Sequence, residues 1–209
     1  MTEEKLTTSV TLDETNIDRD PISLFQSWFD DAVAAALPLP EAMTMATVGH
    51  DGKPHARVLL LKQVDDAGFV FFTNYLSAKA RELEGNPAAA LVFYWPQLER
   101  QVRVEGRVEK TSAEESREYF QTRPRESQIG AWASPQSQVI ESRAVLEQRA
   151  ADLDELYRGR EVDCPEHWGG YRLTPGRIEF WKGRVGRLHD RIVFERDADG
   201  RWAIKRLAP

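Results

Sequence analysis

The chain has 209 residues, of which 41% are hydrophobic and 30% charged, a composition typical of one soluble globular domain. Its net charge of −6 disfavours general nucleic-acid binding, and its single cysteine, Cys164, excludes an internal disulfide and a cysteine-rich metal site. No apolar run reaches the roughly 18 residues of a membrane span, and the N-terminus lacks the apolar core of a signal peptide, so we expect a cytoplasmic protein without a membrane partner.

Residues 1–19 are polar and acidic, and we expect them to form a flexible arm ahead of a single domain over residues 20–209. The domain opens with Asp20-Pro21, where a capping residue precedes proline at the first helical position. The apolar residues that follow recur at helical spacing, up to the prolines at positions 38 and 40. This pattern predicts a helix whose core-facing stripe contains Leu24, Phe25, Trp28, Phe29, Ala32 and Val33.

Strand patterns dominate the segment after this helix. We expect strands over residues 42–48, 57–64, 69–73, 88–95 and 101–110, and a short helix over 78–84. Strands in hairpin succession, joined by turns rich in glycine, proline and aspartate, favour an antiparallel barrel or sandwich. The simplest interpretation is an α+β fold, predominantly antiparallel β, built around a barrel with flanking helices.

Two further helices are expected before the chain returns to strands. Ser112 and Glu115 form a capping box that opens a helix through about residue 121. Ser134-Pro135 predicts the start of a longer helix, with Gly159 as its terminator and an apolar face that includes Val139 and Ile140. The last strands are expected over residues 170–173, 177–181, 187–194 and 202–207.

The stretch IEFWKGRVGRLHDR, residues 178–191, reads as a β-hairpin with its turn between Gly183 and Gly186. Because side chains alternate along a strand, Arg187, His189 and Arg191 should project to one side. Three adjacent basic side chains suit either a bound anion or a solvated edge, and the pattern alone leaves both open. The nearby Trp181 would add an aromatic wall for a planar, phosphorylated ligand.

Other polar residues stand where they could meet an anion. Arg57 and Lys62 bracket an apolar strand, and alternation places them on opposite faces. Ser77 and Lys79 begin a short helix, whose free N–H groups favour phosphate. Gln136 and Ser137 follow a second expected helix start. Caps and solvated surface cations are the structural alternatives at these positions.

Tyr119, Arg123 and Ser127 are spaced by four residues, but Pro124 opposes one continuous helix through them. A turn there could still aim a phenol, a guanidinium and a hydroxyl at one point, a good phosphate cradle. The alternative is a polar stretch that faces solvent. The histidines show no metal-ligand spacing, and no Gly-x-Gly-x-x-Gly motif follows a strand, so neither a metal site nor a Rossmann site is expected.

Several motifs together carry a resemblance. Trp181, a short turn and Arg187-Leu188-His189-Asp190-Arg191, the ending Arg206-Leu207-Ala208-Pro209, and His167-Trp168-Gly169-Gly170-Tyr171 resemble the pyridoxamine 5'-phosphate oxidase family. The match runs from about residue 20 to 209. It implies an FMN-binding split β-barrel that forms a homodimer with flavins at the interface. It also implies oxidation of pyridoxamine or pyridoxine 5'-phosphate to pyridoxal 5'-phosphate, with O2 as electron acceptor and H2O2 released.

The resemblance also implies roles for individual residues. Arg187 and His189 would be catalytic and hold the substrate ring, while the substrate phosphate would be bound by Lys62, Tyr119, Arg123 and Ser127. FMN would be held by Arg57, Val58, Leu59, Leu60, Lys62, Phe72, Thr73, Ser77, Lys79, Gln101, Gln136, Ser137, Trp181 and Arg191.

The chain departs from the family pattern at three places. The arm around residues 9–12 lacks an Arg-x-x-Tyr motif, Ala78 replaces an arginine, and Lys182 replaces a glutamine. Two alternatives follow: a related split-barrel flavin oxidase that acts on another substrate, such as a phenazine precursor, or a non-catalytic protein that binds flavin or pyridoxal phosphate.

Overall fold

The computed structural model describes residues 11–15 and 17–209. Its helices are α1 (Pro21–Ala34), α2 (Ala78–Gly85), α3 (Ala113–Thr122), α4 (Arg125–Ala133) and α5 (Arg143–Leu156), with short 3-10 turns at Pro96–Leu98 and Val185–Arg187. Its strands are β1 (Ala42–Val48), β2 (Pro54–Leu60), β3 (Gln63–Asp65), β4 (Gly68–Asn74), β5 (Ala88–Trp95), β6 (Arg100–Lys110), β7 (Trp168–Lys182), β8 (Asp190–Arg196) and β9 (Trp202–Arg206).

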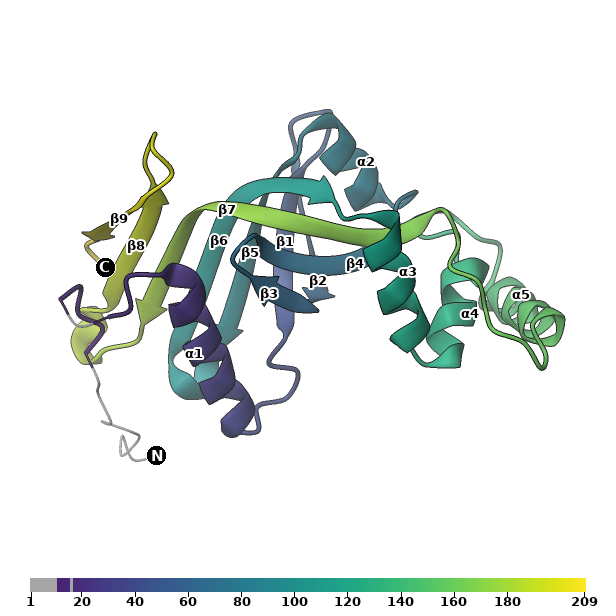
Figure 1. Cartoon of the computed structure of the whole chain (residues 1–209), viewed down its shortest axis with the longest axis horizontal. Coiled ribbons are helices and arrows are strands. Elements are labelled where there is room, and N and C mark those ends of the chain that lie inside the picture. Colours follow the sequence, from purple (N-terminus) through teal and green to yellow (C-terminus); the bar gives the residue numbers. More distant parts are fainter. Residues whose placement is uncertain (1–10, 16) are drawn as a thin grey trace.

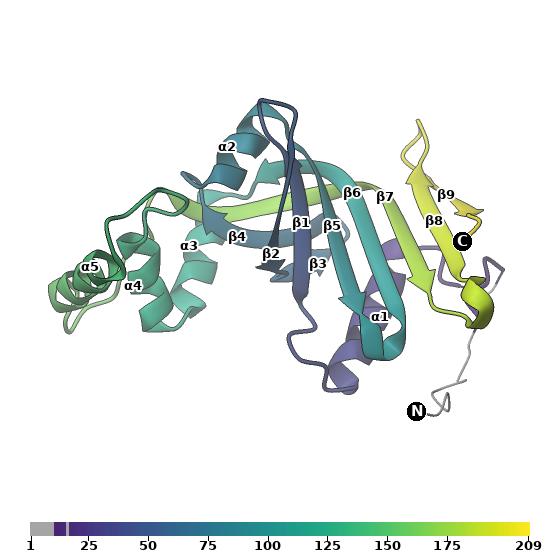
Figure 2. The same ribbon diagram turned by 180° about the vertical axis from the view of Figure 1, so that it is seen from behind.

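The strands form one antiparallel sheet in the order β2-β1-β5-β6-β7-β4-β3, and β8 and β9 extend it from the far half of β7. The long strand β7 makes this possible, because its first half pairs with β4 and its second half with β8. The sheet curls around α1, and α3, α4 and α5 stand at the opposite end of the molecule from β8 and β9 (Figure 1, Figure 2).

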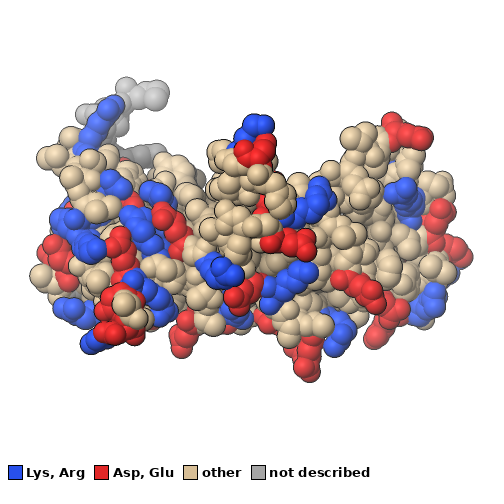
Figure 3. All heavy atoms as spheres, turned by 90° about the horizontal axis from the view of Figure 1, so that it is seen from above, with Lys and Arg blue, Asp and Glu red and all other residues tan. Residues whose placement is uncertain are grey.

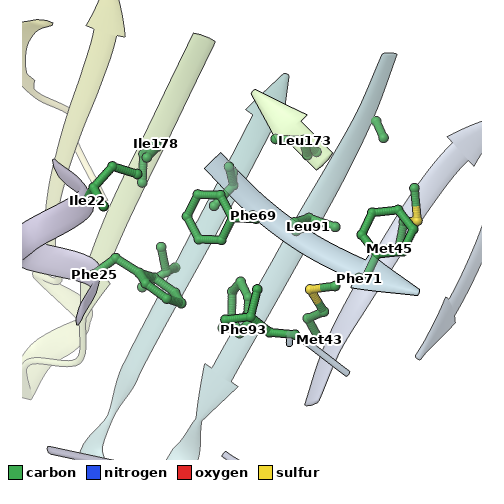
Figure 4. Close-up of a cluster of buried hydrophobic side chains, with 14 of the residues drawn as sticks. Ile22, Phe25, Met43, Met45, Phe69, Phe71, Leu91, Phe93, Leu173 and Ile178 are labelled. Carbon is green, nitrogen blue, oxygen red and sulfur yellow. The ribbon is translucent and has the colours of Figure 1, made fainter. Parts of the chain in front are cut away.

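The core lies between α1 and the concave face of the sheet. Phe25 of α1 meets the rings of Phe69 and Phe93 at centroid distances of 4.9 Å each, in edge-on geometry (Figure 4). The carboxylate of Asp20 caps α1 by accepting from the backbone N–H groups of Ile22 and Ser23, as expected. The prediction that Val33 faces the core is wrong, since Val33 is 51% exposed.

The predicted continuous strand over residues 57–64 is also wrong. The chain leaves β2, which pairs with β1, and enters β3, which pairs with β4 elsewhere in the sheet. At the crossing, the N–H of Leu61 donates to the carbonyl of Glu41 and the N–H of Lys62 donates to that of Val70. Strand alternation therefore does not relate Arg57 to Lys62.

The long helix does not begin at Ser134. Helix α4, which the sequence did not predict, ends at Ala133, and α5 begins only at Arg143. The intervening segment turns, with Ser137 at a φ of 69° and Val139 fully exposed, so no packing supports a helix there. Gln136 and Ser137 consequently lie in a turn rather than at a helix N-terminus.

The C-terminal strands differ from their expected bounds. The two strands predicted over 170–181 are one strand, β7, which passes a bulge opposite Glu105 and Gly106. Strand β8 starts at Asp190, because Gly186 and Arg187 take positive φ values of 70° and 61° before pairing resumes. Arg187 and His189 thus lie in a loop, and the prediction that they share a strand face with Arg191 is wrong.

Part of the expected N-terminal arm is held against the domain. Leu12 is buried in the core, and Arg206 of β9 pairs with Glu14 and donates to the carbonyl of Leu12 at 2.8 Å. Residues 1–10, including the first positions of the altered arm motif, lie outside the described residues, and the division of the chain at residue 19 stays a prediction. Within the described ranges, no helix is both long and apolar enough to cross a membrane.

Candidate active site

A cavity of about 370 Å³ opens where β4, the start of α2 and the α3–α4 corner meet. It gathers nine of the expected site residues from distant parts of the sequence: Leu59, Lys62, Phe72, Thr73, Lys79, Tyr119, Arg123, Ser127 and Gln136. Its polar and aromatic walls suit a small, planar ligand that carries an anionic group.

Lys79 forms the buried floor of one end of the cavity. Ser77 caps α2, and the Lys79 ammonium donates to the side-chain oxygens of Thr73 at 3.1 Å, Ser77 at 3.3 Å and Gln136 at 2.9 Å. Burial, reinforced by the charge of Arg57, lowers the pKa of Lys79. Among the described residues, no carboxylate lies within ion-pair distance of this ammonium, so its charge is available to an anion.

Arg123 defines the other end. It follows the last turn of α3, and Pro124 separates it from α4, yet Tyr119, Arg123 and Ser127 all line the cavity. The Arg123 guanidinium lies 4.6 Å from the ring centroid of Trp168, and burial lowers its pKa. Its Nη1 is buried and has no hydrogen-bond partner in the part of the chain that the structure describes, so a bound anion would satisfy this donor.

An aromatic stack supports this end of the cavity. The rings of Phe72 and Tyr119 lie 4.0 Å apart and nearly parallel, and Trp168 stacks on Phe72 at 5.4 Å. Sequence reasoning had not assigned Trp168 to the site. The signal was the Trp168-Gly169-Gly170 motif: a Cβ at Gly169 would lie 2.2 Å from the Tyr75 hydroxyl, so only glycine allows this approach beside the stack.

A second group of expected residues lies outside this cavity. Gln101, Trp181 and Arg191 form a row across β6, β7 and β8, each directly opposite the next. The ring of His189 lies 4.7 Å from that of Trp181, and its Nδ1 accepts from the N–H of Arg184 at 3.0 Å. A neutral His189 therefore carries its proton on Nε2. Arg187 is exposed in the same loop.

The two groups lie at opposite ends of the folded molecule. The cavity borders α3 and α4, while the β7–β8 loop lies at the other end (Figure 1). One chain does not bring Arg187 and His189 to the cavity. Arg57 is not among the residues that line the cavity, and its guanidinium is engaged by Thr47 and, at 2.9 Å, by Glu82. Val58 is exposed beside it, Leu60 is half-buried, and Ser137 is exposed in its turn.

Comparison with known proteins agrees with this geometry. A family model described as pyridoxamine 5'-phosphate oxidase matches residues 29–157, more than half of the chain. The chain belongs to the pyridoxamine 5'-phosphate oxidase family. A second model of this family, described as the pyridoxine 5'-phosphate oxidase C-terminal dimerisation region, matches residues 168–209, which hold β7, β8, β9 and the loop with Arg187 and His189.

Curated members of the family are close relatives. Proteins named pyridoxine/pyridoxamine 5'-phosphate oxidase from Pseudomonas paraeruginosa and Burkholderia lata are each 58% identical over 200 residues, which cover 95% of this chain and 93% of theirs.

Solved structures share the fold. PhzG from Burkholderia lata, in complex with tetrahydrophenazine-1-carboxylic acid, has a TM-score of 0.91 at 30% identity over 97% of this chain and 98% of its own. An FMN-binding protein related to the family, from Nostoc punctiforme, has a TM-score of 0.71 at 16% identity, over 88% of this chain and 97% of its own. The predicted split β-barrel with flanking helices is confirmed.

Proposed function

We propose that the protein is an FMN-dependent oxidase that converts pyridoxamine and pyridoxine 5'-phosphates to pyridoxal 5'-phosphate. The single observation that carries the proposal is the cavity itself, in which an unpaired buried donor of Arg123 lies with Lys62, Tyr119 and Ser127. Charged and hydroxyl donors around an aromatic wall are the chemistry that recognises a phosphate on a planar ring.

The residues present also fit FMN. Lys79 brings a buried ammonium whose hydrogen-bond partners, within residues 11–15 and 17–209, are all neutral oxygens. It lies next to the N-terminus of α2, where backbone N–H groups and the helix dipole favour a phosphate. Thr73 and Gln136 add neutral groups beside it. Gln101, Trp181 and Arg191 supply an amide, an aromatic ring and a guanidinium in one cross-strand row, which suits the edge of a flavin ring.

The two groups of residues would meet in a homodimer. We infer that a cavity of one chain faces the β7–β8 loop of its partner, with the flavin between them. The match of residues 168–209 to a dimerisation region supports this arrangement, as does the separation of the two groups within one chain (Figure 1).

In this assembly the chain would act chiefly by placement. Arg123, with Lys62, Tyr119 and Ser127, would bind the substrate phosphate. The Nε2–H of His189 and the Arg187 guanidinium of the partner chain would hold the substrate ring from the opposite side. When bound, FMN would supply the redox chemistry, in which two electrons and two protons leave the substrate and O2 is reduced to H2O2; for the amine substrate, water would then release ammonia and give the aldehyde. Aromatic walls from Phe72 and Trp168 would exclude water beside the substrate.

One alternative has a specific observation in its favour. PhzG, at a TM-score of 0.91, was solved with tetrahydrophenazine-1-carboxylic acid, so a phenazine precursor is the second candidate substrate. The phosphate cradle favours the B6 phosphates, because that tricyclic acid offers a carboxylate rather than a phosphate. The 58% identity to pyridoxine/pyridoxamine 5'-phosphate oxidases also supports the first candidate.

The deciding experiment measures H2O2 release and aldehyde absorbance with FMN-loaded protein. Equal amounts of H2O2 and pyridoxal 5'-phosphate from pyridoxamine 5'-phosphate are expected, and pyridoxamine without its phosphate should react poorly. A protein that binds FMN but oxidises neither B6 phosphate would contradict the proposal. Oxidation of a dihydrophenazine carboxylate instead would establish the second candidate, and no oxidation of either would leave a flavin-binding protein without oxidase activity.

A further inference from the structure

A buried carboxylate stands behind the row formed by Gln101, Trp181 and Arg191. Glu179 lies on β7, two residues before Trp181 and therefore on the same face of the sheet. The side chain of Glu179 is 2% exposed, although it is charged. A carboxylate buried to this degree is stable only when cations and donors surround it.

Three arginines surround Glu179. Its Oε1 accepts from Nε of Arg191 at 2.9 Å and lies 2.8 Å from Nη2 of the same guanidinium, and its Oε2 pairs with Arg177 at 3.1 Å and with Arg103 at 3.5 Å. Hydrogen bonds and the charges of these arginines lower the pKa of Glu179, although burial opposes them. The carboxylate is thus charged near neutral pH, and its closest contacts are with Arg191.

The cluster is balanced around this centre. Glu105 and Glu195 pair with Arg177 on the side away from Arg191, so three glutamates and three arginines lie together on β6, β7 and β8. Basic and acidic side chains are interspersed at this end of the molecule (Figure 3). Because Arg177 and Arg103 have other carboxylate partners, Arg191 is the arginine whose side-chain ion pairing depends on Glu179 alone among the described residues.

The contacts of Arg191 fix its guanidinium in one orientation. Nε donates to Glu179, Nη2 lies 2.8 Å from the same carboxylate oxygen, and Nη1 donates to the carbonyl of Ala208 at 2.9 Å. A guanidinium has five N–H donors, so the two hydrogen bonds leave N–H groups on Nη1 and Nη2 for a ligand. Without Glu179, the long side chain would regain its rotamer freedom, and Arg191 would have to be ordered at the moment of binding.

We propose that Glu179 is a positioning residue for the flavin: it holds Arg191 in the orientation that leaves its free donors toward the flavin ring. This inference rests on the proposed function, because it takes FMN as the ligand of Arg191. Glu179 itself does not reach the flavin and acts through Arg191 alone. Its effect should therefore disappear when Arg191 is removed.

The test is a titration of apoprotein with FMN, in which quenching of the flavin fluorescence reports binding. Glu179→Gln, which keeps the shape but loses the charge, should weaken FMN binding about tenfold, as expected for the loss of a charge-assisted contact. Glu195→Gln is the matched control, because it removes the same charge from the same cluster without touching Arg191. Its FMN affinity should stay within about twofold of the wild type.

A double-mutant cycle separates positioning from a structural role. Arg191→Ala should weaken FMN binding, and adding Glu179→Gln to it should cause no further loss. Additive losses, or an FMN affinity of Glu179→Gln equal to that of the wild type, would overturn the proposal. Should Glu179→Gln fail to fold, Glu179→Asp keeps the charge but shortens the reach to Arg191, and the same cycle applies with the same two overturning results. A wild-type protein that does not bind FMN would overturn the proposed function as well, whereas wild-type binding with additive losses would overturn the role of Glu179 alone.

Discussion

Two cationic side chains in the cavity, Lys79 and Arg123, have pKa values that burial lowers, because it removes hydration from both groups. Among the described residues, Lys79 has three neutral acceptors but no carboxylate, and the buried Nη1 of Arg123 has no acceptor. An anion in the cavity would supply the missing negative charge, which would allow a protein with a net charge of −6 to bind the phosphates that we propose as ligands.

The lowered pKa of Lys79 predicts a pH dependence of FMN binding. Lys79 attracts phosphate only while it is protonated, so FMN affinity should fall as pH rises through its lowered pKa, at less alkaline pH than an ordinary lysine would give. Lys79→Met should bind FMN about 10- to 100-fold more weakly at neutral pH and lose this dependence. Fluorescence titrations above about pH 7.5, where the phosphate is already a dianion, measure both effects.

The control for this prediction is Lys53→Met. Lys53 is exposed in the β1–β2 turn and pairs with Asp51 at 2.7 Å, so its removal should leave the titration curve unchanged. If FMN affinity fell with pH in the same way for Lys79→Met and for the wild type, a group other than Lys79 would cause the pH dependence.

Arg187 gives a different prediction, because it lies in the β7–β8 loop and not in the cavity, and the proposed function assigns it to holding the substrate ring. Arg187→Leu should reduce turnover about 100-fold while the FMN content stays close to that of the wild type. Arg187 has a φ of 61°, which leucine tolerates poorly, so Arg187→Asn should be measured beside it and should show the same pattern. Equal losses of turnover and FMN in both variants would remove Arg187 from the proposed catalytic role.

At the level of secondary-structure elements, the sequence predicted most helices and strands but not the place where the chain passes from one strand pairing to another. Strands with alternating apolar residues, the capped helix α1 and the Ser112 cap of α3 all appear where local patterns placed them, although Glu115 pairs with Arg172 and does not complete the capping box. The break between Leu60 and Gln63 has no local signal, because both flanking segments are good strands and only their pairing partners differ. Periodicity reports which face is apolar, not which neighbour a strand selects.

The candidate site shows the same limit. The break at Pro124 was predicted, because proline opposes a continuous helix, whereas α4 and the late start of α5 were not, because they depend on the packing of α4 on α5. Residue types at the site were predicted through the family resemblance, and nine of them share one cavity. The separation of the site residues between the cavity and the β7–β8 loop could not be predicted from sequence spacing, since it depends on how far β7 extends the sheet.

The bulge that bends β6 against β7 gives a prediction about stability. A Cβ on Gly106 would lie 2.1 Å from the carbonyl oxygen of Thr174, whereas a Cβ on Gly176 would meet nothing closer than 3.9 Å. Gly106→Ala should therefore lower the free energy of unfolding by about 2–4 kcal/mol, and Gly176→Ala should change it by under about 1 kcal/mol.

Urea denaturation followed by tryptophan fluorescence measures these two free energies. The pair is a matched control, because both glycines flank the same bulge and both are replaced by the same residue. If the two variants were equally stable, the close approach at Gly106 would not be a determinant of the fold.

Over the full length of the chain, the long axis separates the phosphate cavity from the β7–β8 loop (Figure 1). If each site combines a cavity from one chain with a loop from its partner, defects in the two parts should complement each other. Arg123→Leu and Arg187→Leu should each be nearly inactive alone. Random mixing of the two should restore about a quarter of wild-type activity, because half of the dimers would be mixed and each would hold one intact site.

Co-refolding the two variants in equal amounts and measuring H2O2 release tests this prediction. Mixing either variant with itself under the same conditions is the control and should recover nothing. A mixture as inactive as its components, with mixed dimers verified by differently sized tags, would mean that each site belongs to one chain.

The contacts of the last residues have a practical consequence for handling the protein. The carbonyl of Ala208 accepts from Arg191, and the N–H of Leu207 donates to the carbonyl of Arg191 at 2.9 Å. An affinity tag or surface linker attached after Pro209 would pull on the guanidinium that we assign to the flavin. For immobilised or fused forms of this protein, the exposed turn at Asp197–Gly200 is the better attachment point, because it extends from β8 and β9 on the side away from Arg191.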